Sequence, residues 1–105
     1  INSGGSGSSS WRTITAATDN VFSGEKLFVN TSSNVITLTL PAAPAAGDVI
    51  SFLDIADNFG SNALTLNPNS LKVFGATANG TVSTGGAGFT LVYTGATYGW
   101  KITEK

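Results

Sequence analysis

The sequence contains no cysteine, no histidine and no methionine. Without cysteine and histidine, the chain has no ligands for a structural zinc site, a haem or an iron–sulfur cluster, and it cannot form a disulfide. The Ser-His-Asp and Cys-His triads of hydrolases are excluded as well, because their base and their thiol are missing.

Charge is also scarce. Charged residues make up 10% of the chain, with five Lys or Arg against six Asp or Glu, so the formal net charge is −1. A nucleic-acid-binding protein needs a clustered basic face, which five scattered cations do not supply. No apolar run approaches the roughly 18 residues of a membrane span. We therefore expect neither a nucleic-acid partner nor a membrane span.

What remains is a chain of 105 residues with 41% hydrophobic residues, enough for one domain with a modest core. Serine, threonine and asparagine take the place of charged residues. A surface of short neutral polar groups has little self-repulsion and tolerates close neighbours. This composition favours a protein that works inside an assembly.

The hydrophobic pattern has a period of two, which is typical of β-strands. Residues 34–40 and 63–66 alternate most clearly, and these alternations predict core positions at Ile36, Leu38, Leu40, Leu64 and Leu66. Further strands are predicted over residues 11–15, 26–30, 48–55, 71–74, 81–84, 89–94 and 100–103. Turn-forming residues separate them about every ten residues, as in a sandwich or jelly roll. We expect an all-β protein, with a β-sandwich or jelly-roll-like antiparallel domain over residues 11–105.

Residues 1–10 are rich in glycine and serine, which predicts an extended N-terminal arm or linker. Glycine and serine offer little side-chain area, whereas ordering each residue costs about 1–2 kcal/mol. We expect this arm to lie against another polypeptide, with Ile1 among its few apolar anchors.

Three polar patterns carry possible chemistry. Asp54, Asp57 and Asn58 lie together beside a turn, and oxygen ligands suit calcium, but the EF-hand spacing is absent and these residues commonly form turns. Gly85–Gly88 precedes a predicted strand rather than a helix, so a hairpin loop is favoured over a phosphate cradle. The glycosylation patterns that begin at Asn30 and Asn79 are interpreted as turns. We predict no catalytic residues, no cofactor-binding residues, no metal site and no enzymatic activity.

The aromatic residues allow two interpretations. Trp11, Tyr93, Tyr98 and Trp100 could form a platform for a sugar or a protein. The alternative is that Trp100 fills the core together with Phe28, Phe52 and Phe89, while the two tyrosines border it with their hydroxyls in water. Buried area dominates the energetics of aromatic side chains, so the core interpretation is favoured.

An ordered series of short segments resembles a known module. The series comprises Trp11-Arg-Thr-Ile-Thr, Gly24-Glu-Lys-Leu-Phe-Val-Asn-Thr-Ser-Ser, Ile36-Thr-Leu-Thr-Leu-Pro, Gly47-Asp, Asp54, Asn58-Phe, Leu91-Val-Tyr and Tyr98-Gly-Trp. Together they resemble a small β-rich module of tail-fibre and related virion proteins of tailed bacteriophages. The family often has Asp in place of Asn30 and Asn-Gly in place of Asn69-Ser70. The turn around Asn69 is therefore expected to differ from the corresponding turn of the family.

The resemblance implies a structural virion protein on the particle surface, outside the cell, most directly a tail-fibre or appendage component. It further implies a homo-oligomer, often a trimer, that contacts other virion proteins and binds a host-surface glycan or protein. Three alternatives stay open at this point. One is a capsid decoration protein, another is an extracellular filament subunit that assembles through its N-terminal arm, and the third is a free carbohydrate-binding module.

Overall fold

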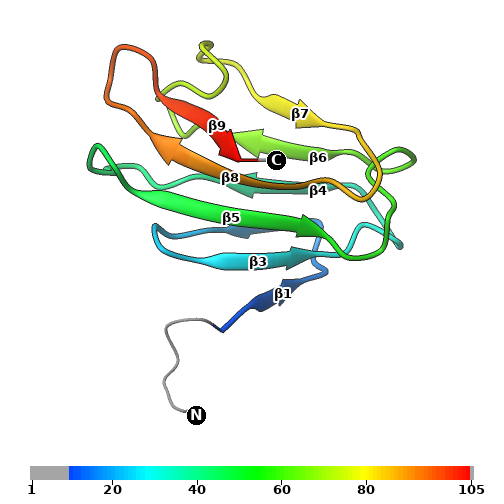
Figure 1. Cartoon of the computed structure of the whole chain (residues 1–105). Helices are drawn as coiled ribbons and strands as arrows, with labels where there is room; N and C mark the ends of the chain where they lie inside the picture. The colour runs from blue at the N-terminus through cyan, green and yellow to red at the C-terminus, as the bar shows by residue number, and fades with distance from the viewer. Residues whose placement is uncertain (1–9, 105) are drawn as a thin grey trace.

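A computed structural model describes residues 10–104, which form two stacked β-sheets and no helix (Figure 1). The strands in chain order are β1 (Arg12–Ile14), β2 (Thr18–Asn20), β3 (Lys26–Val29), β4 (Ile36–Thr39), β5 (Val49–Asp54), β6 (Leu64–Asn67), β7 (Gly80–Val82), β8 (Gly88–Tyr93) and β9 (Trp100–Glu104). The predicted arm lies almost wholly outside the described residues.

The chain crosses from one sheet to the other after each of its first five strands. Sheet A has the order β1-β3-β5-β8-β9, and sheet B has the order β2-β4-β6-β7. Consecutive strands of the first half therefore lie in different layers. Within each layer β1, β3 and β5 run parallel, as do β2, β4 and β6. The last three strands add antiparallel pairs to β6, β5 and β8.

The expectation of an all-β protein is confirmed, but the predicted antiparallel arrangement is wrong for the first half of the chain. Both sheets are mixed, so the strand directions are not those of the antiparallel, jelly-roll-like domain that was expected. Parallel neighbours need a crossover connection, and here each crossover is a strand of the opposite sheet. A period of two in the sequence identifies a strand but does not give its direction, so the pattern could not show which strands are parallel.

Two strand predictions differ from the structure. Strand β2 was not predicted, because aspartate and asparagine are poor strand formers and only pairing with β4 holds the segment extended. Residues 71–74 were predicted as a strand, yet only Val73 forms isolated bridges there. The chain turns at Phe74 and Gly75, which both have positive φ angles.

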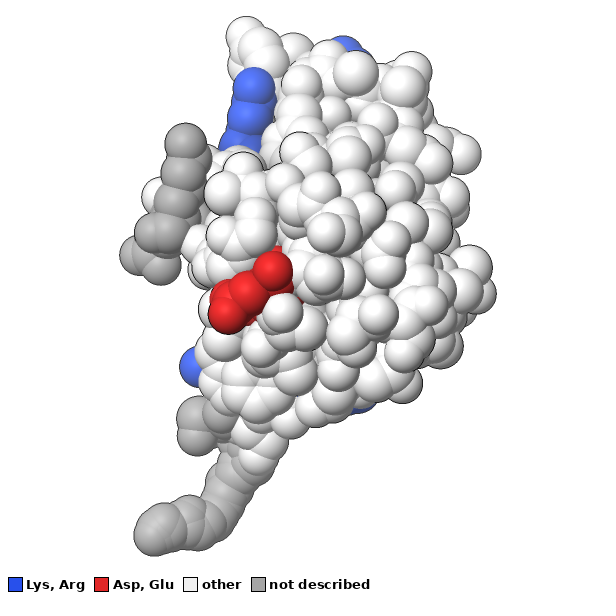
Figure 2. Space-filling view, turned by 90° about the vertical axis from the view of Figure 1, so that its right-hand side faces the viewer, with Lys and Arg blue, Asp and Glu red and all other residues white. Residues whose placement is uncertain are grey.

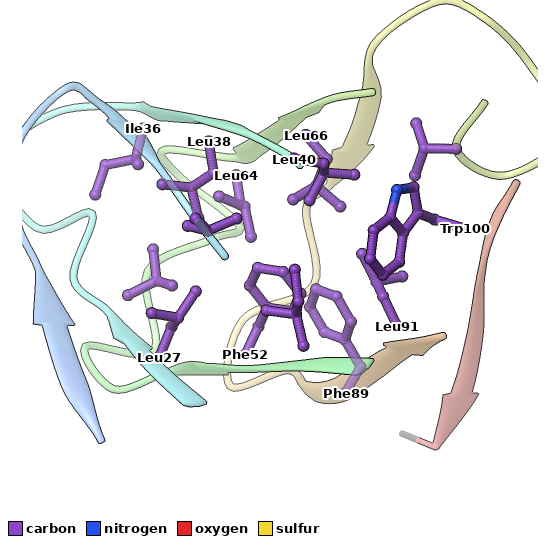
Figure 3. Close-up of a cluster of buried hydrophobic side chains, with 14 of the residues drawn as sticks. Leu27, Ile36, Leu38, Leu40, Phe52, Leu64, Leu66, Phe89, Leu91 and Trp100 are labelled. Atoms are coloured by element: carbon purple, nitrogen blue, oxygen red, sulfur yellow. The ribbon is translucent and has the colours of Figure 1, made fainter. Parts of the chain in front are cut away.

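The core lies between the two sheets, where their alternate side chains meet (Figure 3). The five predicted core residues are all at most 1% exposed, which confirms the register predicted for β4 and β6. Leu27 and Phe52 face them from sheet A, and Trp100 closes one end of the core, where it is completely buried.

Candidate functional site

Asp54 is a carboxylate buried at the end of β5, where it is 2% exposed. Its oxygen atoms accept hydrogen bonds from the backbone amides of Asn58 at 3.1 Å, Phe59 at 2.9 Å and Gly86 at 2.9 Å. Asp54 thus closes the turn that follows its own strand and ties it to the loop before β8. The turn predicted for Asp54, Asp57 and Asn58 is present.

Burial alone would raise the pKa of Asp54, because a charged carboxylate loses its water. Hydrogen bonds from backbone amides favour the charged form, and together they lower the pKa below its ordinary value. The donors are the amides of Phe59, Asn58, Gly86 and Ala56. The ionised side chain is therefore the native form, and it serves as a structural acceptor.

Neighbouring loops at the same end are joined in a similar way. The side-chain amides of Asn58 and Asn62 both donate to the carbonyl oxygen of Thr31, at 2.9 Å and 2.8 Å. These contacts connect the loop after β3 with the loop after β5. Among the described side chains, those of residues 10–103, no group of three or more Asp, Glu, His or Cys residues is arranged to hold a metal ion.

The segment Gly85–Gly88 leads into strand β8, as predicted, but it is not a hairpin loop. Strand β7 belongs to sheet B and β8 to sheet A, so the segment crosses between the layers. The amide of Gly86 donates to Asp54 instead of to a ligand. At Asn30, the side-chain oxygen accepts from the amide of Ser32 at 3.0 Å, which is the turn predicted there.

The aromatic residues divide between core and surface. Trp100, Phe52 and Phe89 are buried, as predicted. The prediction that Phe28 belongs to the core is wrong, because this residue points outward and stacks on Trp11 with ring centroids 4.8 Å apart. Tyr98 is 64% exposed.

Arg12 joins the first three strands. Its guanidinium group donates to Glu25, just before β3, at 2.8 Å and 3.0 Å, and to Asp19 of β2 at 2.9 Å. The hydrogen bond to Glu25 is the largest of the contributions that raise the pKa of Arg12, so this group is always charged. Through Arg12, Glu25 and Asp19 thereby connect the first three strands at the N-terminal edge of the two sheets.

The outer face of sheet A carries a hollow of about 330 Å³. Side chains of Trp11, Lys26, Ser51, Leu53 and Thr90 line it together with Gly88. We refer to it as the sheet A hollow. It forms because three of these residues are small and lie next to each other in register, with Ser51 opposite Thr90 and Leu53 opposite Gly88.

The outer face of sheet B differs in composition from that of sheet A, because its outward side chains are all threonine or asparagine. Thr18, Thr37, Thr65 and Thr81 lie side by side across the four strands. Asn20, Thr39 and Asn67 form the adjacent row. We call this set of seven residues the threonine face. It bears no charge and no large side chain.

A larger crevice of about 450 Å³ opens between the edges of the two sheets. Val82 of β7 and Ile102 of β9 line it, and Phe89 and the backbone of the β7–β8 connection complete it. Its lining side chains are mainly apolar, and none is charged. It therefore offers no group that could act chemically on a substrate.

Sequence reasoning had singled out neither of the two outer faces as a site. The threonine alternation in residues 34–40 was visible, but the alignment of four threonines across β2, β4, β6 and β7 depends on the strand order. Residues 10–104 contain no helix with the length and the apolar character that crossing a membrane requires. No protein-family model matches the chain, and no curated protein is significantly similar to it in sequence.

Proposed function

We propose that this chain is a structural module of a tailed-bacteriophage virion, a component of a tail fibre or another appendage, which assembles as a homotrimer. The observation that carries the proposal is the threonine face, a neutral surface four strands wide. The resemblance of the sequence to virion modules supplies the biological setting.

The threonine face suits close packing against a neighbouring subunit. Burying a lysine or glutamate side chain in an interface costs up to about 2 kcal/mol of rotamer entropy, and threonine has far less to lose. No charge has to be removed from water, which is the costly step in burying polar surfaces. A sheet with this face can therefore be covered at low cost.

Charged groups lie elsewhere on the molecule. Figure 2 looks onto the end of the sandwich at which β1, β3 and β5 end, and few charged side chains are visible there beside a broad uncharged surface. The loops at this end, residues 15–17, 30–35, 55–63 and 83–87, contain a single charged residue, Asp57. The low charge at this end of the sandwich and on the threonine face supports contact with neighbouring proteins at both of these surfaces.

The acidic residues support a structural role rather than catalysis. Asp54 holds backbone amides, Asp19 and Glu25 hold Arg12, and Asp48 accepts from the hydroxyl of Ser23 and the amide of Ala45. A general acid or base needs a proton-transfer partner in a substrate. These carboxylates are instead engaged within the fold.

The mass of the chain in solution tests the proposal. Size-exclusion chromatography with light scattering should give three times the chain mass of 10.6 kDa at micromolar concentration. A monomer that binds only to a second virion protein would favour the capsid decoration alternative. Growth into open-ended polymers would favour the filament alternative, because head-to-tail contacts that do not close form helices.

A pair of variants tests where the contact lies. Thr65→Lys places a charge at the centre of the threonine face, and should convert the trimer to folded monomers. Thr13→Lys adds the same charge to the outer face of sheet A, on β1, and should leave the trimer intact. Equal effects of both variants, or an effect of Thr13→Lys alone, would contradict a contact through sheet B.

A further inference from the structure

The sheet A hollow has the shape of a small ligand site. Small residues on β5 and β8 form its floor, and larger side chains rise beside it, namely Trp11 just before β1, Lys26 of β3 and Leu53 of β5. Its volume of about 330 Å³ lies at the small end of the range for ligand pockets, which suits a single ring better than an extended chain.

One wall of the hollow is an aromatic ring held in a fixed plane. Trp11 stacks on Phe28 with ring planes only 9° apart, and it remains 39% exposed. A pyranose ring presents a row of C–H groups on one side, and these groups pack against the electron-rich surface of an aromatic ring. Because Phe28 already fixes the ring, binding would order little that is mobile.

The floor of the hollow is polar. The hydroxyl groups of Ser51 and Thr90 are hydrogen-bonded to each other at 2.9 Å, and either one can be the donor. A pair of hydroxyls has two protons, and the mutual bond uses one of them. The other proton and the oxygen lone pairs can be directed at hydroxyl groups of a ligand.

Lys26 adds a positive charge at the rim. Both salt bridges among the side chains of residues 10–103 are made by Arg12, so Lys26 has no carboxylate partner within that range. The hollow itself is lined by no acidic side chain. An ammonium group beside an aromatic wall and two hydroxyls is complementary to a carboxylate borne by a polar ring.

We infer that the sheet A hollow binds an acidic sugar residue, a pyranose with a carboxylate group, within a polysaccharide of the host surface. Trp11 packs against the ring, Ser51 and Thr90 contact its hydroxyls, and Lys26 pairs with its carboxylate. The inference rests on the proposed function, because it supplies that function's contact with a host. It places binding on sheet A and assembly on sheet B.

Tryptophan fluorescence offers a direct binding assay. The chain has two tryptophans, of which Trp100 is completely buried, so a ligand in the hollow should change the emission of Trp11 alone. The full chain would be titrated with a hyaluronan oligosaccharide, in which every second sugar is a glucuronate. A dextran oligosaccharide of similar length tests neutral sugars, and a poly-glutamate peptide tests acidic peptides.

The expected result is a saturable change with the hyaluronan oligosaccharide, little response to the other two probes, and weaker binding as salt is raised. Lys26→Gln should weaken binding by roughly two- to fivefold, the range of an exposed ion pair. Lys101→Gln, which removes the same charge from β9 outside the hollow, is the matched control and should bind normally. Calorimetry on Trp11→Ala, with folding checked by circular dichroism, should show no measurable binding.

Three results would overturn the inference: no saturable binding of the hyaluronan oligosaccharide, equal binding of dextran, or equal binding of poly-glutamate. An equal loss in Lys26→Gln and Lys101→Gln would also overturn it, because it would show unspecific attraction. The monomeric Thr65→Lys variant separates this site from the proposed assembly. It should retain the affinity of each hollow, so a failed trimer and a failed binding site give different results.

Discussion

The carboxylate of Asp54 accepts a hydrogen bond from the amide of Gly86, 32 residues later in the chain, at 2.9 Å. The contact connects the end of β5 with the segment that carries the chain from sheet B back to sheet A. Two further amides of the turn after β5 bind the same carboxylate. One buried acidic side chain thus fixes two crossings between the layers.

Replacement of this carboxylate should be costly. Asp54→Asn retains the size of the side chain but turns one acceptor into a donor that faces backbone amides. We expect a loss of about 2–3 kcal/mol in the free energy of unfolding, since hydrogen bonds to charged groups are the strong ones. Urea unfolding measures it. Asp57→Asn makes the same charge change at an exposed position of the same turn and should be close to neutral.

The same residue predicts a dependence of stability on pH. The pKa of Asp54 is lower in the folded protein than its ordinary value of about 3.9, so the unfolded chain binds the proton more readily. The stabilisation is fully present above the ordinary value and is lost as the pH falls through the folded-state pKa. Asp54→Asn should lack this part of the acid transition, and an unchanged transition would contradict the structural role of the carboxylate.

A core substitution tests the register of the two sheets. Leu38 of β4 is completely buried, whereas its neighbour Thr37 points outward. Leu38→Ala should lower the free energy of unfolding by about 2–5 kcal/mol, through lost burial and a residual cavity. Thr37→Ala should change it by less than about 1 kcal/mol. Equal melting temperatures for the two variants would show that the register is wrong.

The turn after β6 offers a stabilising change. Asn69 and Ser70 both have positive φ angles, 57° and 72°, and the amide of Leu71 donates to the carbonyl oxygen of Pro68 across them. A left-handed conformation is costly for serine but not for glycine. Ser70→Gly should therefore raise the free energy of unfolding by about 0.5–1 kcal/mol.

Thermal unfolding measures this gain against a control. Ser83→Gly introduces glycine where the φ angle is not positive, and there it should be neutral or destabilising. A melting temperature that falls in Ser70→Gly would show that the serine side chain contributes more than the strain it carries.

Divalent ions should have no influence on folding. Backbone amides already occupy the oxygen atoms of Asp54 that calcium would need. We expect the melting temperature to be the same with EDTA and with added calcium. A drop of several degrees in EDTA would instead identify Asp54 and Asp57 as ion ligands.

The sequence predicted much of this fold because alternation of leucine and threonine in β4 and β6 reports directly on burial. It misplaced Phe28, since residues 27–29 are all apolar and the alternation is interrupted there. It could not show that β1, β3 and β5 are parallel, because strand direction depends on the path of the connections. The threonine face and the sheet A hollow were missed for the same reason, since both require the strand order.

Thiol labelling tests most directly whether the threonine face is the assembly surface. The chain has no cysteine, so Thr65→Cys and Thr13→Cys each introduce a single reactive group, on sheet B and on sheet A. Labelling by a maleimide would be followed at a concentration where the protein is assembled, and again after dilution. The thiol at position 65 should react much more slowly in the assembly than after dilution, while the thiol at position 13 reacts at one rate in both. A thiol at position 65 that reacts equally fast in both states would contradict assembly through sheet B.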